Sequence, residues 1–275
     1  MKTIYAVFGD PVGHSLSPVM HNAAFEALGM DCEYHTFRVT KDDLKAAIHG
    51  AKAMGFGGLN LTIPLKEIAL RLVEPDPIAK AIGAVNTIEF SKGSIIGHNT
   101  DGIGAVHALR SSGVVIRDSN VLVLGAGGAA RAVVYQLVQD GARVTIANRT
   151  IERAEKLADN VSSLGTARGT GLEDLPGLVE QSHIIINTTS VGMHPDTGQT
   201  LITSDMMHSG QVIFDLVYNP LQTRLLEEAK KAGAITIDGV KMLVHQGARS
   251  FRIWTGVEPP PNVMERSVKD VLEKQ

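Results

Sequence analysis

The sequence predicts an α/β protein of two domains, each built on a sheet whose strands alternate with helices. Three observations lead to this class. Short apolar segments bounded by polar residues and glycine recur along the 275 residues, separated by segments of helical length. A continuous apolar strand followed by a glycine-rich loop begins a second such series near residue 120. The chain is also long enough for two domains with separate cores.

The composition is that of a globular protein and argues against several other classes. Hydrophobic residues make up 44% and charged residues 20%, and the net charge of −3 comes without a dense basic run. A nucleic acid is therefore not an expected partner. The only cysteine, Cys32, leaves no intrachain disulfide and no cysteine-based metal cluster. We see neither a signal peptide nor a membrane span of ~20 apolar residues, and so expect a cytoplasmic protein.

The first hundred residues predict a parallel or mixed sheet. We expect strands at 4–8, 33–39 and 57–63, and helices at 18–28 and 42–54 that end before glycine. A hairpin is expected over 87–96, with Lys92 and Gly93 in its turn. Strands separated by helices of this length favour βαβ units.

The stretch Asn60-Leu-Thr-Ile-Pro-Leu-Lys66 is unusual for the end of a strand. Asn60 and Thr62 lie two residues apart and share a face, and Pro64 ends the strand because it cannot donate to a sheet ladder and suits the first turn of a helix. Lys66 then faces the positive end of the helix dipole, an unfavourable place for a cation. Two interpretations are open: a solvated lysine beside a turn, or a small polar pocket with a proton donor at its rim.

Residues 120–238 predict a doubly wound, nucleotide-binding sheet. Strands are expected at 121–124, 144–147, 184–187, 212–216 and 235–238, each ending in polar residues or glycine, with a helix at 221–231 among those between them. A short helix at 104–109 precedes the series. Helices at 242–255 and after Pro261 follow the completed sheet, so we expect them to pack back on the first domain. The predicted domains are residues 1–101 with 240–275, and residues 102–239.

The loop after the strand at 121–124 fits the dinucleotide fingerprint of a Rossmann-type domain. It consists of Gly125, Ala126, Gly127, Gly128, Ala129 and Ala130, and a helix follows it. Gly125 permits the tight turn and Gly127 lets the backbone approach a pyrophosphate, which the amides at the helix start then face. An ordinary tight turn is the alternative, and the strand and helix on either side count against it.

The residues after the second strand of this domain favour NADP over NAD. NAD binders usually carry an acid here, which bonds the ribose 2′-hydroxyl. This chain instead has Asn148, Arg149 and Thr150, with Arg153 close behind. A carboxylate would repel a 2′-phosphate, whereas two arginines can hold it with charge-assisted hydrogen bonds. Thr150 can also cap the following helix.

Polar residues at other element ends are candidates for a substrate site. Ser15 and Ser17 lie two apart before the first helix, where their hydroxyls can converge on one anionic group. A serine before a proline is also an ordinary helix cap, and both roles fit. The further candidates are Asn86, Asp101, Tyr218 and Gln246, of which the last three have structural explanations of similar weight.

Together these motifs resemble the shikimate dehydrogenase family, over essentially the whole chain. The order and spacing of the short motifs carry the resemblance: Gly13-His-Ser-Leu-Ser-Pro18, Asn60-Leu-Thr-Ile-Pro-Leu-Lys66, Gly83-Ala-Val-Asn-Thr87, Asn99-Thr-Asp101-Gly, the glycine loop, Asn148-Arg-Thr150 and Asn187-Thr-Thr-Ser190. The resemblance implies an amino-terminal substrate domain completed by carboxyl-terminal helices, and an NADP domain. It also implies reversible, NADPH-dependent reduction of 3-dehydroshikimate to shikimate, in aromatic amino acid biosynthesis.

The resemblance gives a role to each candidate residue. Lys66 and Asp101 would be the catalytic pair, and Ser15 and Ser17 would hold the substrate carboxylate. The ring hydroxyls and carbonyl would be bound by Asn60, Thr62, Asn86, Asp101 and Gln246, with Tyr218 nearby. The cofactor site would comprise Gly125, Ala126, Gly127, Gly128, Ala129, Asn148, Arg149, Thr150, Arg153, Thr188, Gly239 and Met242. No metal is expected, because a lysine can supply the proton that hydride transfer needs.

Three questions stay open from the sequence. Burial of Lys66 favours its neutral amine, whereas Asp101 favours the ammonium, and the sequence does not decide between them. A quinate/shikimate dehydrogenase that prefers NAD is one alternative function, and a non-catalytic NADP-binding sensor of the same fold is another. The chain is expected to act on a small-molecule substrate as a monomer or a homodimer.

Overall fold

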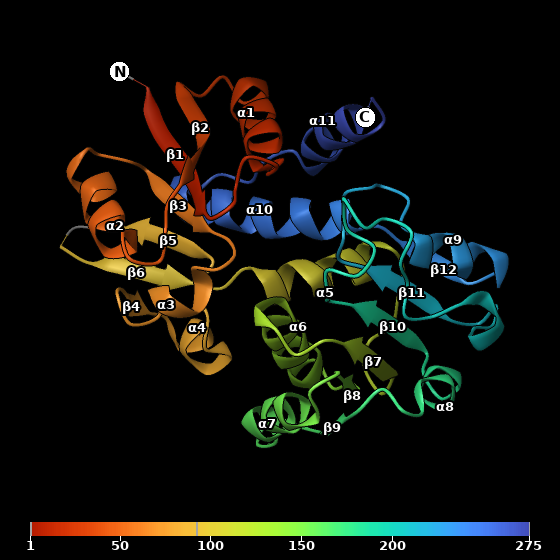
Figure 1. Ribbon diagram of the computed structural model, residues 1–275. Helices are drawn as coiled ribbons and strands as arrows, with labels where there is room; N and C mark the ends of the chain where they lie inside the picture. Colours follow the sequence, from red (N-terminus) through yellow and green to blue (C-terminus); the bar gives the residue numbers. More distant parts are fainter. Residues whose placement is uncertain (1, 92, 275) are drawn as a thin grey trace. The chain divides into compact units, whose positions relative to one another are not determined.

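The computed structural model describes residues 2–91 and 93–274, which form two compact units (Figure 1). The first unit runs to Asp101 and includes Val244–Val271, and the second comprises Gly102–Leu243 with the chain from Leu272 onward. The chain passes between them at the start of helix α5 (Asp101–Ser111) and within helix α10 (Gly239–Thr255). Each unit has an apolar core of its own.

The first unit contains a mixed sheet, one of the two kinds that the sequence predicted, with six strands in the order β2-β1-β3-β5-β6-β4. β1 pairs in parallel with β2 and β3, and the hairpin strands β5 and β6 are antiparallel to each other. The predicted turn residue Lys92 lies outside the described residues. The elements are β1 (Thr3–Gly9), α1 (Ser17–Ala27), β2 (Cys32–Arg38), α2 (Leu44–Ala53), β3 (Gly58–Leu61), α3 (Lys66–Ala69), β4 (Glu74–Pro75), α4 (Pro77–Ile82), β5 (Thr87–Phe90) and β6 (Ile95–His98).

The register of three neighbouring strands places polar residues side by side in this sheet. Asn60 of β3 lies opposite Thr87 of β5, and Thr87 lies opposite His98 of β6. Directly opposed residues of antiparallel strands have Cβ atoms only about 5 Å apart. Asn60 and Thr87 are both buried, so their polar groups must find partners inside the protein.

Several element starts differ from the sequence prediction, and two of them concern candidate residues. Pro64 lies in a turn before α3 and not in the first turn of that helix, which begins at Lys66. The Leu65 amide closes this turn on the Thr62 carbonyl at 2.8 Å. The fixed φ of proline suits a turn as well as a helix start, so the sequence did not distinguish the two. Asp101 is itself the first residue of α5, which is longer at both ends than the predicted 104–109.

The second unit contains a parallel sheet in the order β12-β11-β10-β7-β8-β9. The strand order reverses between β7 and β10, which is the doubly wound arrangement that the sequence predicted. Helices α6 and α7 pack on β7 to β9, and α9 packs on β11 and β12. The elements are β7 (Asn120–Leu124), α6 (Gly128–Gln139), β8 (Arg143–Ala147), α7 (Ile151–Val161), β9 (Ala167–Thr170), α8 (Leu175–Glu180), β10 (Ile184–Asn187), η1 (Ser204–Met206), β11 (Val212–Asp215), α9 (Arg224–Lys231) and β12 (Ile235–Ile237).

Most of the chain after this sheet belongs to the first unit. From Val244 onward α10 belongs to the first unit, as does nearly all of α11 (Pro261–Leu272). The Trp254 indole donates a hydrogen bond of 2.9 Å to the Ile88 carbonyl on β5. It lies so close to Gly58 that a Cβ there would be 2.2 Å from the indole nitrogen, so β3 needs glycine at this position.

Candidate active site

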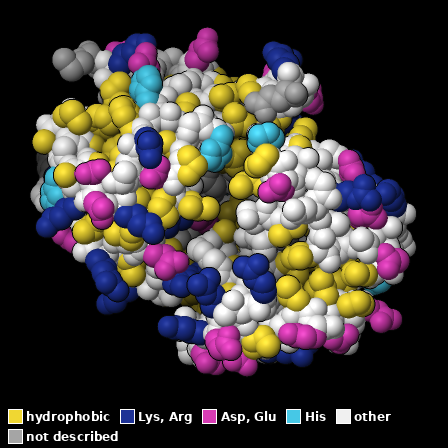
Figure 2. Space-filling model, viewed as in Figure 1, with side chains coloured by type: hydrophobic (Ala, Val, Ile, Leu, Met, Phe, Trp, Pro, Cys, Tyr) yellow, Lys and Arg dark blue, Asp and Glu magenta, His cyan; other side chains and the backbone are white. Residues whose placement is uncertain are grey.

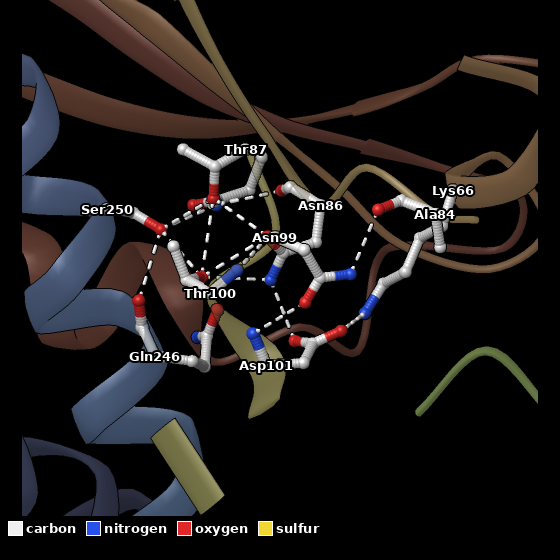
Figure 3. A network of polar contacts seen from close by, with 10 residues as sticks. Lys66, Ala84, Asn86, Thr87, Asn99, Thr100, Asp101, Gln246 and Ser250 are labelled. Atoms are coloured by element: carbon white, nitrogen blue, oxygen red, sulfur yellow. Dashed lines mark hydrogen bonds and ion pairs between the residues drawn. The ribbon is translucent and has the colours of Figure 1, made fainter. Parts of the chain in front are cut away.

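A connected group of buried polar side chains occupies the first unit where β3, β5, the start of α5 and helix α10 meet (Figure 3). We call this group the polar network. Its members are each at most 8% exposed, and hydrogen bonds join them, as buried polar groups require. They are Asn60, Asn86, Thr87, Asn99, Thr100, Asp101 and Ser250.

Lys66 and Asp101 form an ion pair at the edge of the polar network. Lys66 Nζ lies 2.6 Å from Asp101 Oδ2, with 20% of the lysine side chain exposed and 5% of the aspartate. Asp101 Oδ1 accepts a 2.7 Å hydrogen bond from Asn86, and the Asp101 amide donates to Asn99. Asn86 and Lys66 thus hold one carboxylate oxygen each, and the lysine side chain remains partly exposed. Such a lysine can deliver a proton to a bound molecule.

The side-chain amide of Asn60 forms its hydrogen bonds with other groups of the protein. Its Oδ1 accepts a 2.7 Å hydrogen bond from the Tyr34 hydroxyl. Its Nδ2 lies 3.1 Å from each of three acceptors: the Asn86 carbonyl, Thr87 Oγ1 and Ser250 Oγ. Asn60 is 6% exposed, so in this structure it positions its neighbours.

Asn86 is similarly engaged. Its Oδ1 accepts from the Thr100 amide at 2.8 Å, and its Nδ2 donates to Thr100 Oγ1 and to Asp101. Asn86 therefore sets the orientation of the carboxylate that pairs with Lys66. Among the predicted substrate residues of the first unit, those that remain partly exposed are Ser15, Thr62, Lys66 and Gln246.

The two serines lie together at the start of α1. Ser15 Oγ donates to Ser17 Oγ at 3.2 Å, and the Ser17 amide donates to Ser15 Oγ at 3.3 Å. Ser17 is the first helical residue, and Leu16 occupies the cap position without a side-chain cap. The interpretation of Ser17 as a simple helix cap is therefore wrong, and the hydroxyl pair lies at the positive end of the α1 dipole, which favours an anion.

The glycine loop joins β7 to α6 and fits a dinucleotide. Gly125 has φ +108°, and a Cβ there would lie 2.8 Å from Thr188 Oγ1, so only glycine suits the position. A Cβ at Gly127 or Gly128 would meet nothing within 4 Å, which leaves room for a pyrophosphate. The first turn of α6 has neither an acidic residue nor a side-chain cap, so its amides are available to an anion.

The end of β8 leads into Arg149, and the first turn of α7 carries Arg153 together with one acid, Glu152. Arg149 and Arg153 are both exposed around the start of α7. Asn148 Nδ2 donates to the Thr150 carbonyl at 2.9 Å and shapes the turn between them, whereas Thr150 occupies the cap position of α7 without a side-chain cap bond. These residues fit the 2′-phosphate of NADP.

The remaining predicted residues divide between the units. Tyr218 follows β11 and is half-buried in the second unit, whereas Gln246 lies on α10 in the first unit. Met242 is buried, and a Cβ at Gly239 would lie 2.6 Å from the Leu216 carbonyl. Close packing therefore explains the glycine at 239 without a cofactor.

A second buried network, which the sequence analysis missed, organises the loop after β11. Asp215 is fully buried and accepts hydrogen bonds from Asn187, Thr223 and the Val217 amide at 2.6–3.0 Å. Burial raises the pKa of Asp215 to about 6, although these hydrogen bonds oppose the rise. The signal was an amide and an acid at the ends of neighbouring strands, since Asn187 and Asp215 pair directly in the register.

Within residues 2–91 and 93–274, no three His, Cys, Asp or Glu side chains are grouped so that they could hold a metal ion. In the same residues, no helix combines the length and the apolar character needed to cross a membrane.

A unit with a cradle for NADP and a unit with a lysine proton donor are what an NADP-linked oxidoreductase requires. Three family models match the chain in order. They are described as the shikimate dehydrogenase substrate binding domain at residues 7–88, shikimate / quinate 5-dehydrogenase at 108–243, and the shikimate 5′-dehydrogenase C-terminal domain at 239–269. The chain belongs to the shikimate dehydrogenase family, which confirms the prediction from its motifs.

Individual relatives agree with the family models. The shikimate dehydrogenase (NADP(+)) of Methanosarcina mazei is 60% identical over 99% of this chain and 100% of that protein. A crystal structure of a shikimate dehydrogenase in complex with NADP+ has a TM-score of 0.92 at 43% identity, over 98% of this chain and 96% of that one. The enzyme from Thermus thermophilus, in complex with NADP(H) and shikimate, has a TM-score of 0.90 at 38% identity, over 98% and 100%. The predicted fold and oxidoreductase class are confirmed.

Proposed function

We propose that this chain is an NADP-dependent shikimate dehydrogenase, which reduces 3-dehydroshikimate to shikimate and catalyses the reverse oxidation. The observation that carries the proposal is the 2.6 Å ion pair between Lys66 and Asp101, partly open to ligand at the edge of the polar network. Family membership supports the same reaction. The serine pair at the start of α1 supports a substrate with a carboxylate.

The cofactor and the chain divide the chemistry. NADPH supplies the hydride when it is bound at the glycine loop, where Gly127 and Gly128 leave room for its pyrophosphate and Arg149 and Arg153 would hold its 2′-phosphate. Reduction of a ketone creates negative charge on its oxygen, and Lys66 donates a proton from Nζ to that oxygen. In the reverse direction, neutral Lys66 takes the proton of the substrate hydroxyl. Asp101 holds the lysine in place for both steps.

The proposed substrate contacts follow from exposure. The partly exposed Ser15 and the buried Ser17 beside it bind the carboxylate, and Thr62 and Gln246 are open enough to contact the ring. Asn60 and Asn86 contribute to binding mainly through the neighbours that they fix. Tyr218, on the second unit, is proposed as a further ring contact. Thr188, Gly239 and Met242 stay proposed cofactor contacts. The monomeric or homodimeric state and the cytoplasmic location also stay proposals.

An assay of two substrates against two cofactors tests the function. Shikimate and quinate are each offered with NADP and with NAD, and nicotinamide absorbance is followed. We expect kcat/KM to be highest for shikimate with NADP. A preference for quinate with NAD would support the broader dehydrogenase, and no turnover in any combination would support the non-catalytic sensor.

A lysine variant tests the proton donor. Lys66→Ala should fold and bind shikimate but lose kcat by about 10²- to 10⁴-fold, because it removes the group that moves the proton. Lys80→Ala on α4 is the matched control, since Lys80 is an exposed lysine of the same unit. A loss confined to KM would make Lys66 a binding residue, and a near-normal kcat would contradict the mechanism.

A further inference from the structure

Tyr34 connects two groups of proposed substrate residues, and the sequence analysis gave it no role. It lies on the edge strand β2 and is 1% exposed. Its hydroxyl donates to Asn60 Oδ1 at 2.7 Å. The side chain of Ser17, the first residue of α1, interacts with the same phenol and lowers its pKa, against the rise that burial causes.

These contacts complete a path of polar interactions from one end of the site to the other. Ser15 donates to Ser17, Ser17 contacts Tyr34, and Tyr34 donates to Asn60. From Asn60 the path continues through the polar network to Asp101, which pairs with Lys66 (Figure 3). Tyr34 is therefore the link between the proposed carboxylate-binding hydroxyls and the part of the site that holds the proton donor.

The direction of the central hydrogen bond is fixed by chemistry. Asn60 Nδ2 faces the Asn86 carbonyl, which can only accept, so Asn60 Oδ1 must be the atom that faces Tyr34. The single proton of the phenol is then committed to Asn60, and the phenol oxygen is left to accept from Ser17. The Ser15 hydroxyl, which donates to Ser17 in this structure, is therefore the one that can turn and donate to a bound carboxylate. Burial raises the pKa of Tyr34 well above 10, so the phenol keeps this proton at any working pH.

Tyr34 is held by its backbone and by its ring as well. On this sheet edge, the Asn22 side chain accepts from the Tyr34 amide at 2.8 Å and donates to its carbonyl at 3.0 Å. The His21 ring stacks on the phenol with centroids 4.4 Å apart and planes within 7°. Burial lowers the pKa of His21 to about 3, and its ring nitrogens have no hydrogen-bond partner among the described residues. His21 thus packs against the phenol as an uncharged ring and does not compete for the phenol proton.

We infer that Tyr34 is a positioning residue for this reaction, which fixes the separation between the carboxylate-binding serines and the Lys66–Asp101 pair by tying Ser17 to Asn60. The inference rests on the proposed function, because it assumes a substrate that spans these two places. A rigid link of this kind favours binding of a molecule whose carboxylate and reacting carbon are a set distance apart. Removing this link should weaken substrate binding much more than it slows the proton transfer.

The test is Tyr34→Phe, with Tyr5→Phe as the matched control. Both changes remove one buried phenol oxygen from the same aromatic cluster, since Tyr5 also packs against Trp254. Among the described residues, no hydrogen bond joins the Tyr5 hydroxyl to the serines or to Asn60. For Tyr34→Phe we expect KM for shikimate to rise about tenfold, as for the loss of one buried hydrogen bond, while kcat and KM for NADP stay within about twofold. Tyr5→Phe should leave all three unchanged.

Two further measurements separate positioning from general stability and from the proposed function itself. Incorporation of p-aminophenylalanine at residue 34 keeps a donor at the ring's end and should recover most of the lost affinity. Calorimetric titration with shikimate gives Kd without turnover. A wild-type chain that binds shikimate but shows no turnover would contradict the proposed function alone. Equal Kd for wild type and Tyr34→Phe, or equal losses for Tyr34→Phe and Tyr5→Phe, would overturn the role of Tyr34.

Discussion

His98 has an acidic partner on each ring nitrogen. Nδ1 lies 2.7 Å from Asp76 Oδ2, and Nε2 lies 3.0 Å from Glu89 Oε2. Burial lowers the pKa of His98, but the two carboxylates outweigh it and raise the pKa above the ordinary 6.5. Burial by itself raises the pKa of Asp76. The hydrogen bonds of Asp76 with His98 and the Ala79 amide outweigh this effect and lower its pKa below 3.8. A protonated His98 thus joins β6 to the start of α4.

This cluster predicts a pH-dependent contribution to the stability of the first unit. A raised histidine pKa stabilises the fold fully below pH 6.5, and this stabilisation is lost as pH rises through the folded-state pKa. The lowered pKa of Asp76 stabilises the fold above pH 3.8, and this stabilisation is lost as pH falls through the folded-state pKa. His98→Gln should therefore cost most between these limits, about 1–3 kcal/mol in the free energy of unfolding, and much less at pH 9.

Urea unfolding followed by circular dichroism at pH 5.5 and pH 9 measures this difference. His49→Gln is the control, because His49 is an exposed histidine on α2 of the same unit. A cost for His98→Gln that is equal at the two pH values would show that the histidine acts through packing and not through its charge.

Sequence reasoning found the residues whose position was odd for a structural role, and missed those that only support them. Lys66 stood out as a cation at a helix start, and the structure pairs it with Asp101. Tyr34 lies inside an ordinary strand, where an aromatic residue is expected. Its importance depends on a hydrogen bond to Asn60, 26 residues away, which strand pairing creates and local pattern cannot show.

Among the elements, buried apolar strands were predicted well, and a polar edge strand was not. The central strands β7, β10 and β11 are almost wholly buried, and their continuous apolar runs identified them. β9 reads Ala-Arg-Gly-Thr, lies at a sheet edge and has no buried residue, so neither periodicity nor hydrophobicity revealed it. It forms because β8 offers an unpaired edge.

The two arginines at the turn from β8 into α7 are expected to determine the preference for NADP over NAD. Arg149→Ala and Arg153→Ala should each raise KM for NADP by roughly ten- to a hundredfold and leave KM for NAD nearly unchanged, because only NADP has a 2′-phosphate to lose its charge-assisted contacts. Steady-state kinetics with both cofactors measures this. Arg168→Ala, an exposed arginine on β9 of the same unit, is the control. Equal effects on NADP and NAD would place the two arginines away from the 2′-phosphate.

At the scale of the whole molecule, charge is distributed as expected for an enzyme of small anionic ligands. Lysine and arginine side chains are interspersed with acidic ones on the face shown in Figure 2, and the net charge is −3. Its anion-binding features are local: two serines at α1, and a glycine loop with two arginines in the second unit. Specific contacts, and not a broad electrostatic field, therefore select the ligands.

The single tryptophan of the chain has an optical consequence. Trp254 belongs to the first unit, where its indole bonds Ile88 and its ring lies 5.6 Å from His21 and 6.2 Å from Tyr34, between centroids. Excitation at the red edge of the absorption band, where tyrosine is dark, therefore produces emission from the first unit alone. Trp254 is therefore an intrinsic fluorophore beside the phenol proposed to position the substrate. Its emission reports on the first unit, and the second unit contributes no tryptophan emission.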